Sequence, residues 1–99
     1  MKYSHEQNYQ RLIHDTYSSV KFLNSLDLHV LEECLQVFRE NIFTKERSPK
    51  QFEQILEQNG YESLNLAKEI YHSMQIILEF MDKGMKGLLT GDLSAFAIQ

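Results

Sequence analysis

Residues that interrupt helices are scarce in this chain, which has one proline and four glycines among its 99 residues. Tryptophan is absent, and the single cysteine, Cys34, cannot form an internal disulfide. Cys34 lies in an apolar stretch, so we expect a buried thiol in a reducing compartment, and hence a cytoplasmic protein. The first residues lack the apolar run of a signal peptide, and no apolar run approaches the ~20 residues of a membrane span.

Positive charge is also scarce. The chain has 14 acidic and 10 basic residues, a formal net charge of −4, and no block of one sign. A protein that binds nucleic acid has to neutralise several phosphates, which requires a basic surface. The composition therefore favours a soluble acidic protein that binds neither nucleic acid nor membrane.

Motifs that carry chemistry are missing or incomplete. The segment from Lys83 to Gly87 follows a helix and lacks the spacing of a phosphate-binding loop. Glu69 and His72 have the Glu-x-x-His spacing of di-metal helical bundles, but the motif occurs once, whereas such sites need two. We therefore predict a protein that is not an enzyme and that holds no metal or cofactor, with a metal-binding bundle centred on Glu69 and His72 as a further alternative.

Apolar residues recur at alternating spacings of three and four along most of the chain, the pattern of amphipathic helices. The first predicted helix covers residues 5–24 and the second covers residues 28–44. We expect Asp27 to cap the second helix. Its predicted buried seam consists of Leu28, Leu31, Leu35, Phe38 and Ile42, which leaves Val30 and Val37 on the opposite side.

The strongest helix start is Ser48-Pro49, because serine caps a helix and proline fits its first turn. The third predicted helix covers residues 49–58 and ends at Gly60, which we expect to adopt a left-handed conformation in a Schellman cap with Tyr61. The fourth covers residues 64–86 and ends at Gly84 or Gly87. Beyond it we expect Asp92 to cap one last turn.

These elements predict an all-α fold. The simplest arrangement is a small antiparallel bundle of four helices, about 5–24, 28–44, 49–58 and 64–86, with a short apolar C-terminal tail. A chain of 99 residues is expected to form one domain, residues 1–99.

The fourth helix is unusually apolar. Its seam runs through Ala67, Ile70, Met74, Ile77, Met81 and Leu88, and its apolar side chains together span roughly 220° of the helical wheel, about twice what packing on one face requires. Either this helix lies at the centre of the monomer, or part of it contacts another chain. Three methionines on this face suit an irregular protein partner.

The sequence thus favours a non-enzymatic protein–protein interaction module, a regulator, inhibitor or adaptor that presents an apolar helical face as a homodimer. The candidate interface residues are Met74, Ile77, Phe80, Met81, Met85, Val30, Val37 and Phe96. The apolar tail Phe96-Ala97-Ile98, whose Phe96 and Ile98 belong to the last predicted turn, is expected to dock on its own bundle or to insert into a neighbouring subunit. The alternative function is a transcriptional or nucleic-acid-associated regulator that uses the basic residues between Lys45 and Lys50.

Overall fold

The computed structural model describes residues 5–41, 50–61 and 64–96. The fold is all-α, with four helices packed together and no strand in these ranges. The helices are α1 (His5–Asn24), α2 (Leu28–Glu40), α3 (Lys50–Gln58) and α4 (Leu64–Glu79). The helical path of α4 continues through a π-helical turn, η1 (Phe80–Gly84), into α5 (Met85–Thr90), and a short 3-10 turn, η2 (Ser94–Phe96), follows.

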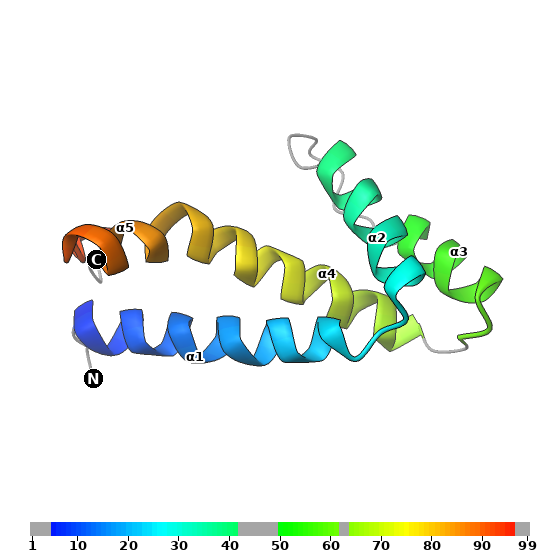
Figure 1. Ribbon diagram of the computed structural model, residues 1–99, viewed down its shortest axis with the longest axis horizontal. Helices are drawn as coiled ribbons and strands as arrows, with labels where there is room; N and C mark the ends of the chain where they lie inside the picture. The colour runs from blue at the N-terminus through cyan, green and yellow to red at the C-terminus, as the bar shows by residue number, and fades with distance from the viewer. Residues whose placement is uncertain (1–4, 42–49, 62–63, 97–99) are drawn as a thin grey trace.

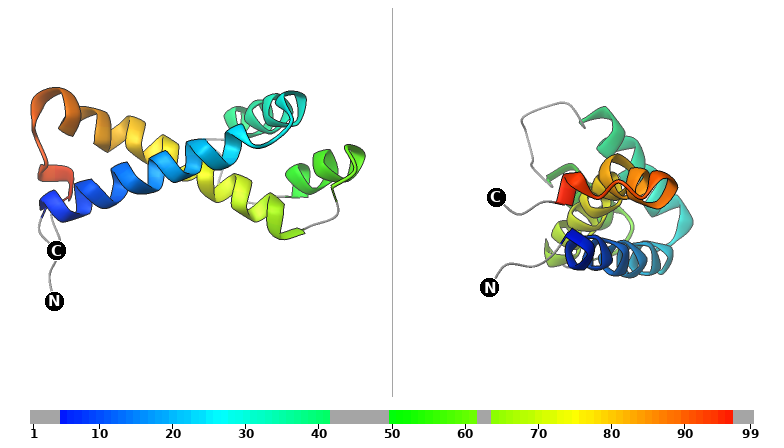
Figure 2. Two further views of the ribbon diagram at one scale, coloured as in Figure 1. Left: turned by 60° about the horizontal axis from the view of Figure 1, so that its bottom comes forward. Right: turned by 90° about the vertical axis from the view of Figure 1, so that its left-hand side faces the viewer.

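The four helices form two antiparallel pairs of unequal length. The long pair consists of α1 and the continuous path of α4, η1 and α5, while α2 and α3 lie across one end of it (Figures 1 and 2). The molecule is elongated, with extents of 43, 28 and 27 Å. At the end that contains α5, the described part of the chain places two helices, α1 and α5, side by side (Figure 1).

The apolar core lies where all four helices meet. Its buried side chains are Leu23 of α1, Val30, Cys34 and Phe38 of α2, Phe52 and Leu56 of α3, and Ala67, Ile70 and Met74 of α4. Tyr71 joins two aromatic rings at the edge of this core, with ring centroids 5.9 Å from Phe38 and 6.1 Å from Phe52. The N-terminal half of the predicted seam of the fourth helix is therefore buried within a single chain.

The buried face of α2 agrees with the prediction only in part, because Phe38 of the predicted seam is buried and Leu31 packs against the core. Leu28 and Leu35, two residues of the predicted seam, are 68% and 40% exposed, whereas Val30 and Cys34 are fully buried. Both faces of this helix carry apolar residues at spacings of three and four, so periodicity alone could not choose between them. The positions of α3 and α4 decide which face is covered.

The end of α3 matches the prediction in detail. Gly60 has a φ of 85°, and the Gly60 N–H donates to the carbonyl of Glu57 at 3.2 Å. The Tyr61 N–H donates to the carbonyl of Leu56 at 2.9 Å. These two bonds define a Schellman motif, which satisfies carbonyl groups that the helix end leaves unpaired.

Asp27 occupies the N-cap position of α2, as predicted, but its side chain does not cap the helix. Its Oδ2 atom instead accepts a hydrogen bond from the Tyr61 hydroxyl at 3.1 Å. The carboxylate thus joins the start of α2 to the turn after α3. The predicted caps Ser48 and Ser63 lie outside the described residues.

Two helix boundaries also differ from the prediction. The last residue of α2 is Glu40, and the predicted extension to residue 44 runs beyond residue 41, where the described range ends. The fourth helical path passes both predicted ends, Gly84 and Gly87, and stops at Thr90. Gly91, with a φ of 73°, forms its left-handed C-cap and donates its N–H to the carbonyl of Gly87 at 2.9 Å.

Candidate interaction surface

Four large apolar side chains are exposed along η1 and α5. Met81 is 64% exposed, Met85 38%, Leu88 60% and Leu89 75%. Successive spacings of four, three and one residue keep them on one side of the helical path. We call this set of four residues the α5 stripe.

The π-helical turn rotates the residues that follow it about the helix axis, and Leu88, a residue of the predicted seam, faces solvent there rather than α1. The Met85 N–H donates to the carbonyl of Phe80, five residues earlier, so the helix is wider here than the 3.6-residue repeat that the seam assumes. Gly84 in this turn and Gly87 in α5 are the buried residues of the path from Phe80 to Thr90. A Cβ atom at Gly87 would lie 3.1 Å from Cε2 of Tyr9, so the glycine allows α1 to approach closely.

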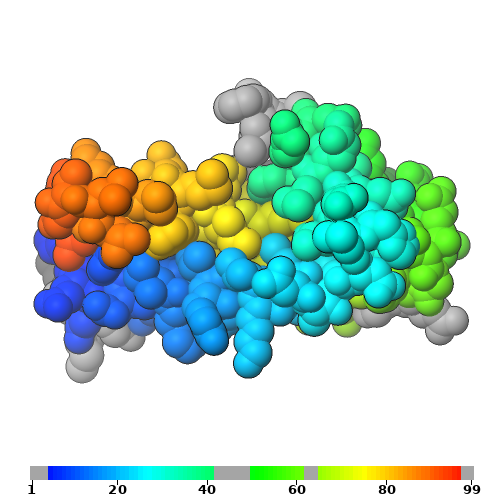
Figure 3. Space-filling model, viewed as in Figure 1, coloured from blue at the N-terminus to red at the C-terminus, as the bar shows by residue number. Residues whose placement is uncertain are grey.

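The stripe lies on the two-helix end of the molecule. In the space-filling view, α2 rises over one end of the α1–α4 pair, while α5 lies beside the start of α1 without a helix above it (Figure 3). Charged residues surround the stripe, and two ion pairs lie beside it. The pairs are Lys83 with Glu79 at 3.6 Å and Lys86 with Asp92 at 3.3 Å.

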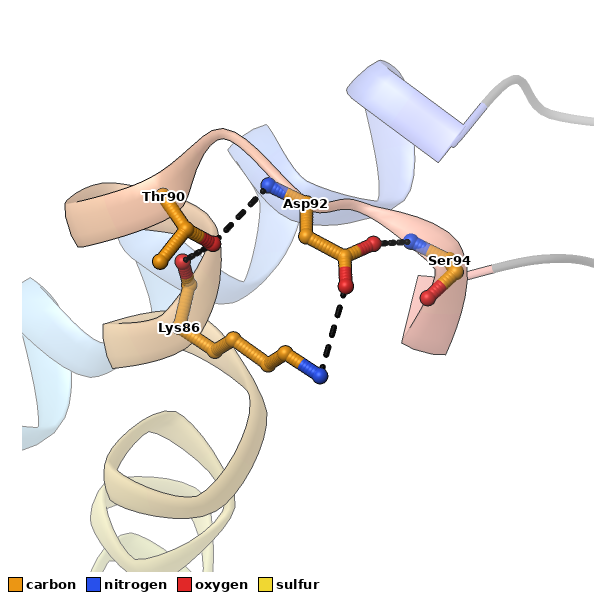
Figure 4. A network of polar contacts seen from close by, with 4 residues as sticks. All are labelled: Lys86, Thr90, Asp92 and Ser94. Atoms are coloured by element: carbon orange, nitrogen blue, oxygen red, sulfur yellow. Dashed lines mark hydrogen bonds and ion pairs between the residues drawn. The ribbon is translucent and has the colours of Figure 1, made fainter.

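A polar network holds the chain where α5 ends (Figure 4). The Thr90 hydroxyl donates to the carbonyl of Lys86 at 2.7 Å, and the Asp92 N–H donates to the Thr90 hydroxyl oxygen at 3.3 Å. The Ser94 N–H donates to Oδ1 of Asp92 at 3.0 Å, which confirms Asp92 as the cap of the last turn. Hydrogen bonds from Ser94, together with Lys86, lower the pKa of Asp92 to about 2.

Phe96 docks on its own bundle. It is 7% exposed, and its ring packs against the ring of Tyr9 in an edge arrangement with centroids 5.5 Å apart. Nδ2 of Asn8 donates to the Phe96 carbonyl at 3.0 Å. In this structure Phe96 is thus a packing residue that covers the start of α1, and it offers little surface to a partner. Ile98, which was expected in the same turn, lies outside the described residues.

The other predicted interface residues fall into three groups. Met74 is 3% exposed and Val30 is fully buried, so both are core residues with no surface to offer a partner. Ile77, Phe80 and Val37 are half-buried. Only Met81 and Met85 are open to solvent.

Val37 lines a shallow hollow of about 420 Å³ between α2 and α3, together with Ile55, Glu32, Glu33 and Gln36. Two apolar side chains, Val37 and Ile55, line it, and two carboxylates border it. The hollow therefore offers a partner less apolar contact than the α5 stripe.

Sequence reasoning missed Leu89 and did not include Leu88 among the interface residues. The sequence did indicate that one of these leucines is exposed. Side chains of adjacent helical residues point about 100° apart around the helix axis, so Leu88 and Leu89 cannot both face α1. Among the described residues, four further large apolar side chains are exposed elsewhere, at Tyr17, Val20, Leu28 and Leu35.

Groups that could support chemistry are sparse in the described ranges. Glu69 and His72 are both exposed on α4, and no set of three His, Cys, Asp or Glu side chains in those ranges is close enough to hold a metal ion. Burial, aided by the charge of Glu33, raises the pKa of the Cys34 thiol to about 11, which makes it a poor nucleophile at neutral pH.

Two further expectations concern nucleic acid and membranes. Residues 45–49 of the basic segment lie outside the described residues, and Lys50 is the exposed first residue of α3. Within the described ranges, each helix is too short or too polar to cross a bilayer.

Comparisons with known protein families, with curated proteins and with solved structures give no match to this chain.

Proposed function

We propose that this chain is a non-enzymatic protein–protein interaction module whose contact surface is the α5 stripe and whose partner is a second copy of the chain. The observation that carries the proposal is the clustering of Met81, Met85, Leu88 and Leu89 on one side of a helix, each at least 38% exposed. Contiguous apolar surface of this kind is typical of protein contact sites. Flexible methionine side chains adapt well to such contacts.

The shape of the molecule supports a second copy as the partner. At the α5 end, α1 and the α4–α5 path lie side by side as a single layer of two helices in the described residues, whereas α2 and α3 cover the other end (Figures 1 and 2). Two such layers placed face to face would form a four-helix bundle, which buries the apolar face of each layer. A two-fold symmetric contact of this kind requires only one self-complementary surface.

The experiment is analytical ultracentrifugation of the full chain and of two matched variants over the micromolar range. Leu88→Glu places a charge in the stripe, while Leu28→Glu places the same charge on α2, where Leu28 is 68% exposed. We expect the wild-type chain and Leu28→Glu to be dimers and Leu88→Glu to be a monomer. A monomeric wild-type chain, or a Leu88→Glu dimer as stable as the wild type, would overturn the proposal.

A further inference from the structure

We infer that Met81 and Met85 are modification sites, and that their oxidation to methionine sulfoxide by a peroxide separates the two copies of the chain. This inference rests on the proposed self-association and names a chemical change that reverses it. Both side chains belong to the α5 stripe, where Met81 is 64% exposed and Met85 is 38% exposed. Because the susceptibility of a methionine to oxidation follows its exposure, an oxidant can reach both residues in the separated chain.

The two other sulfur-containing side chains of the described ranges are protected. Met74 belongs to the same helical path but is 3% exposed, because it lies in the core where four helices meet. Cys34 is fully buried, and its raised pKa leaves little of the reactive thiolate at neutral pH. Within these ranges, a peroxide therefore attacks the sulfur atoms of the stripe first and leaves those of the core unchanged.

The modification is a two-electron oxidation of the thioether. A lone pair on the sulfur atom attacks one oxygen of hydrogen peroxide, so that an S–O bond forms and the O–O bond breaks. The sulfur atom is oxidised, and the second oxygen leaves as water. Reversal requires a sulfoxide reductase and two thiols, which become a disulfide while the sulfoxide oxygen leaves as water. An external dithiol has to supply these thiols, since Cys34 is the single cysteine of the chain.

A sulfoxide in the stripe opposes self-association because its oxygen atom needs a hydrogen-bond donor. In the separated chain, water is that donor. In the proposed pair the opposite surface is a second stripe, and the two methionines and two leucines of a stripe carry no N–H or O–H group in their side chains. Burial of an unpaired polar group is unfavourable, so we expect oxidation to raise the dissociation constant of the pair at least about tenfold.

The first test treats the full chain with dilute hydrogen peroxide and maps oxidation by peptide mass spectrometry. Met81 and Met85 should be oxidised at least about tenfold faster than Met74. Sedimentation of the treated chain should show the weaker pairing, while circular dichroism should show that the helices remain. Oxidation of Met74 as fast as that of the stripe would overturn this inference, as would an oxidised chain that pairs with unchanged affinity.

The protein concentration separates this inference from the proposal on which it rests. Because the pair covers the stripe, the oxidation rates of Met81 and Met85 should fall as the chain concentration rises through the dissociation constant. Rates that stay constant while a dimer forms would show that the stripe is not the contact surface, and would overturn the proposed function. A wild-type chain that is monomeric at all concentrations would overturn it as well.

The second test makes the same substitution in the stripe and in the core. Leucine is apolar, similar in size to methionine and resistant to peroxide, so Met81→Leu/Met85→Leu should form a dimer both before and after treatment. Met74→Leu is the control and should dissociate on treatment as the wild type does. Both changes conserve volume, so we expect the fold to persist in each. Dissociation of Met81→Leu/Met85→Leu by peroxide would show that another group responds and would overturn the assignment of these two sites.

Discussion

The ring of Phe96 packs edge-on against the ring of Tyr9, with centroids 5.5 Å apart and an angle of 74° between the ring planes. The two residues lie near opposite ends of the chain. Their contact, together with the hydrogen bond from Asn8 to the Phe96 carbonyl, attaches the last turn to the first helix. Through this contact the short turn η2 packs against α1 at the end of the molecule that contains α5.

The first prediction concerns this contact. Phe96→Ala removes a buried ring that neighbouring atoms cannot easily replace, so we expect the free energy of unfolding to fall by about 3 kcal/mol. Urea denaturation followed by circular dichroism measures the change at a protein concentration where the oligomeric state is the same for both chains. Leu28→Ala, at a position 68% exposed, is the control and should change stability by less than about 0.5 kcal/mol. Equal losses for the two variants would show that the tail does not pack as described.

The second prediction concerns the turn after α3. Gly60 has a φ of 85°, a conformation in which a Cβ atom is unfavourable. We expect Gly60→Ala to lower the free energy of unfolding by about 1 kcal/mol and Gly60→Asn to lower it less, because asparagine tolerates this region better. Thermal and urea unfolding of the two variants test this order, and the reverse order would contradict the Schellman geometry.

The third prediction concerns a hydroxyl group in α1. Among the described side chains, Oγ1 of Thr16 is buried without a hydrogen-bond partner. Thr16→Val keeps the shape and the branched Cβ atom while it removes the unpaired polar group, so we expect an increase in stability of about 1 kcal/mol. Thr16→Ser, which keeps the hydroxyl and loses the methyl group, should be destabilising. A Thr16→Val chain less stable than the wild type would mean that the hydroxyl is satisfied in solution.

The fourth prediction concerns pH. The folded-state pKa of Asp92 is about 2, below its ordinary value of 3.8, mainly because of hydrogen bonds from Ser94. As the pH falls, the unfolded chain binds this proton before the folded chain does. The stabilising contribution of Asp92 is therefore present above about pH 4 and is lost between about pH 4 and pH 2.

The carboxyl carbon of Asp92 in an NMR titration should show a midpoint near 2. The Asp92→Asn chain should also lose less stability than the wild type over that pH interval. A midpoint at the ordinary value would show that the cap at Ser94 is not formed in solution.

Several local features could be predicted from the sequence because short-range interactions determine them. The bounds of α1, residues 5–24, agree with the apolar periodicity, and Gly60 and Asp92 act at the turns where their conformational and hydrogen-bonding preferences placed them. Each of these features depends on residues within a few positions of one another. The all-α fold follows from the same local information.

The buried face of α2 could be predicted only in part in this way, since Leu31 and Phe38 of the predicted seam lie against the core and Leu28 and Leu35 do not. The face with Leu28 and Leu35 and the face with Val30 and Cys34 are both apolar and both have helical spacing. Which one is covered depends on where α3 and α4 lie, and these elements are distant in sequence. For the same reason, Val30 is a core residue and not part of an interface in this structure.

The candidate site divides along the same line. The sequence by itself determined that the fourth helix has more apolar surface than one face can bury, since that depends only on composition and spacing. Only the tertiary structure decided which of those residues are free: four helices bury Met74, whereas along η1 and α5 Gly84 and Gly87 are buried and Met81, Met85 and Leu88 face solvent. The physical reason is that the burial of a side chain depends on the neighbouring elements that cover it. The spacing of apolar residues within one helix does not indicate where those neighbouring elements end.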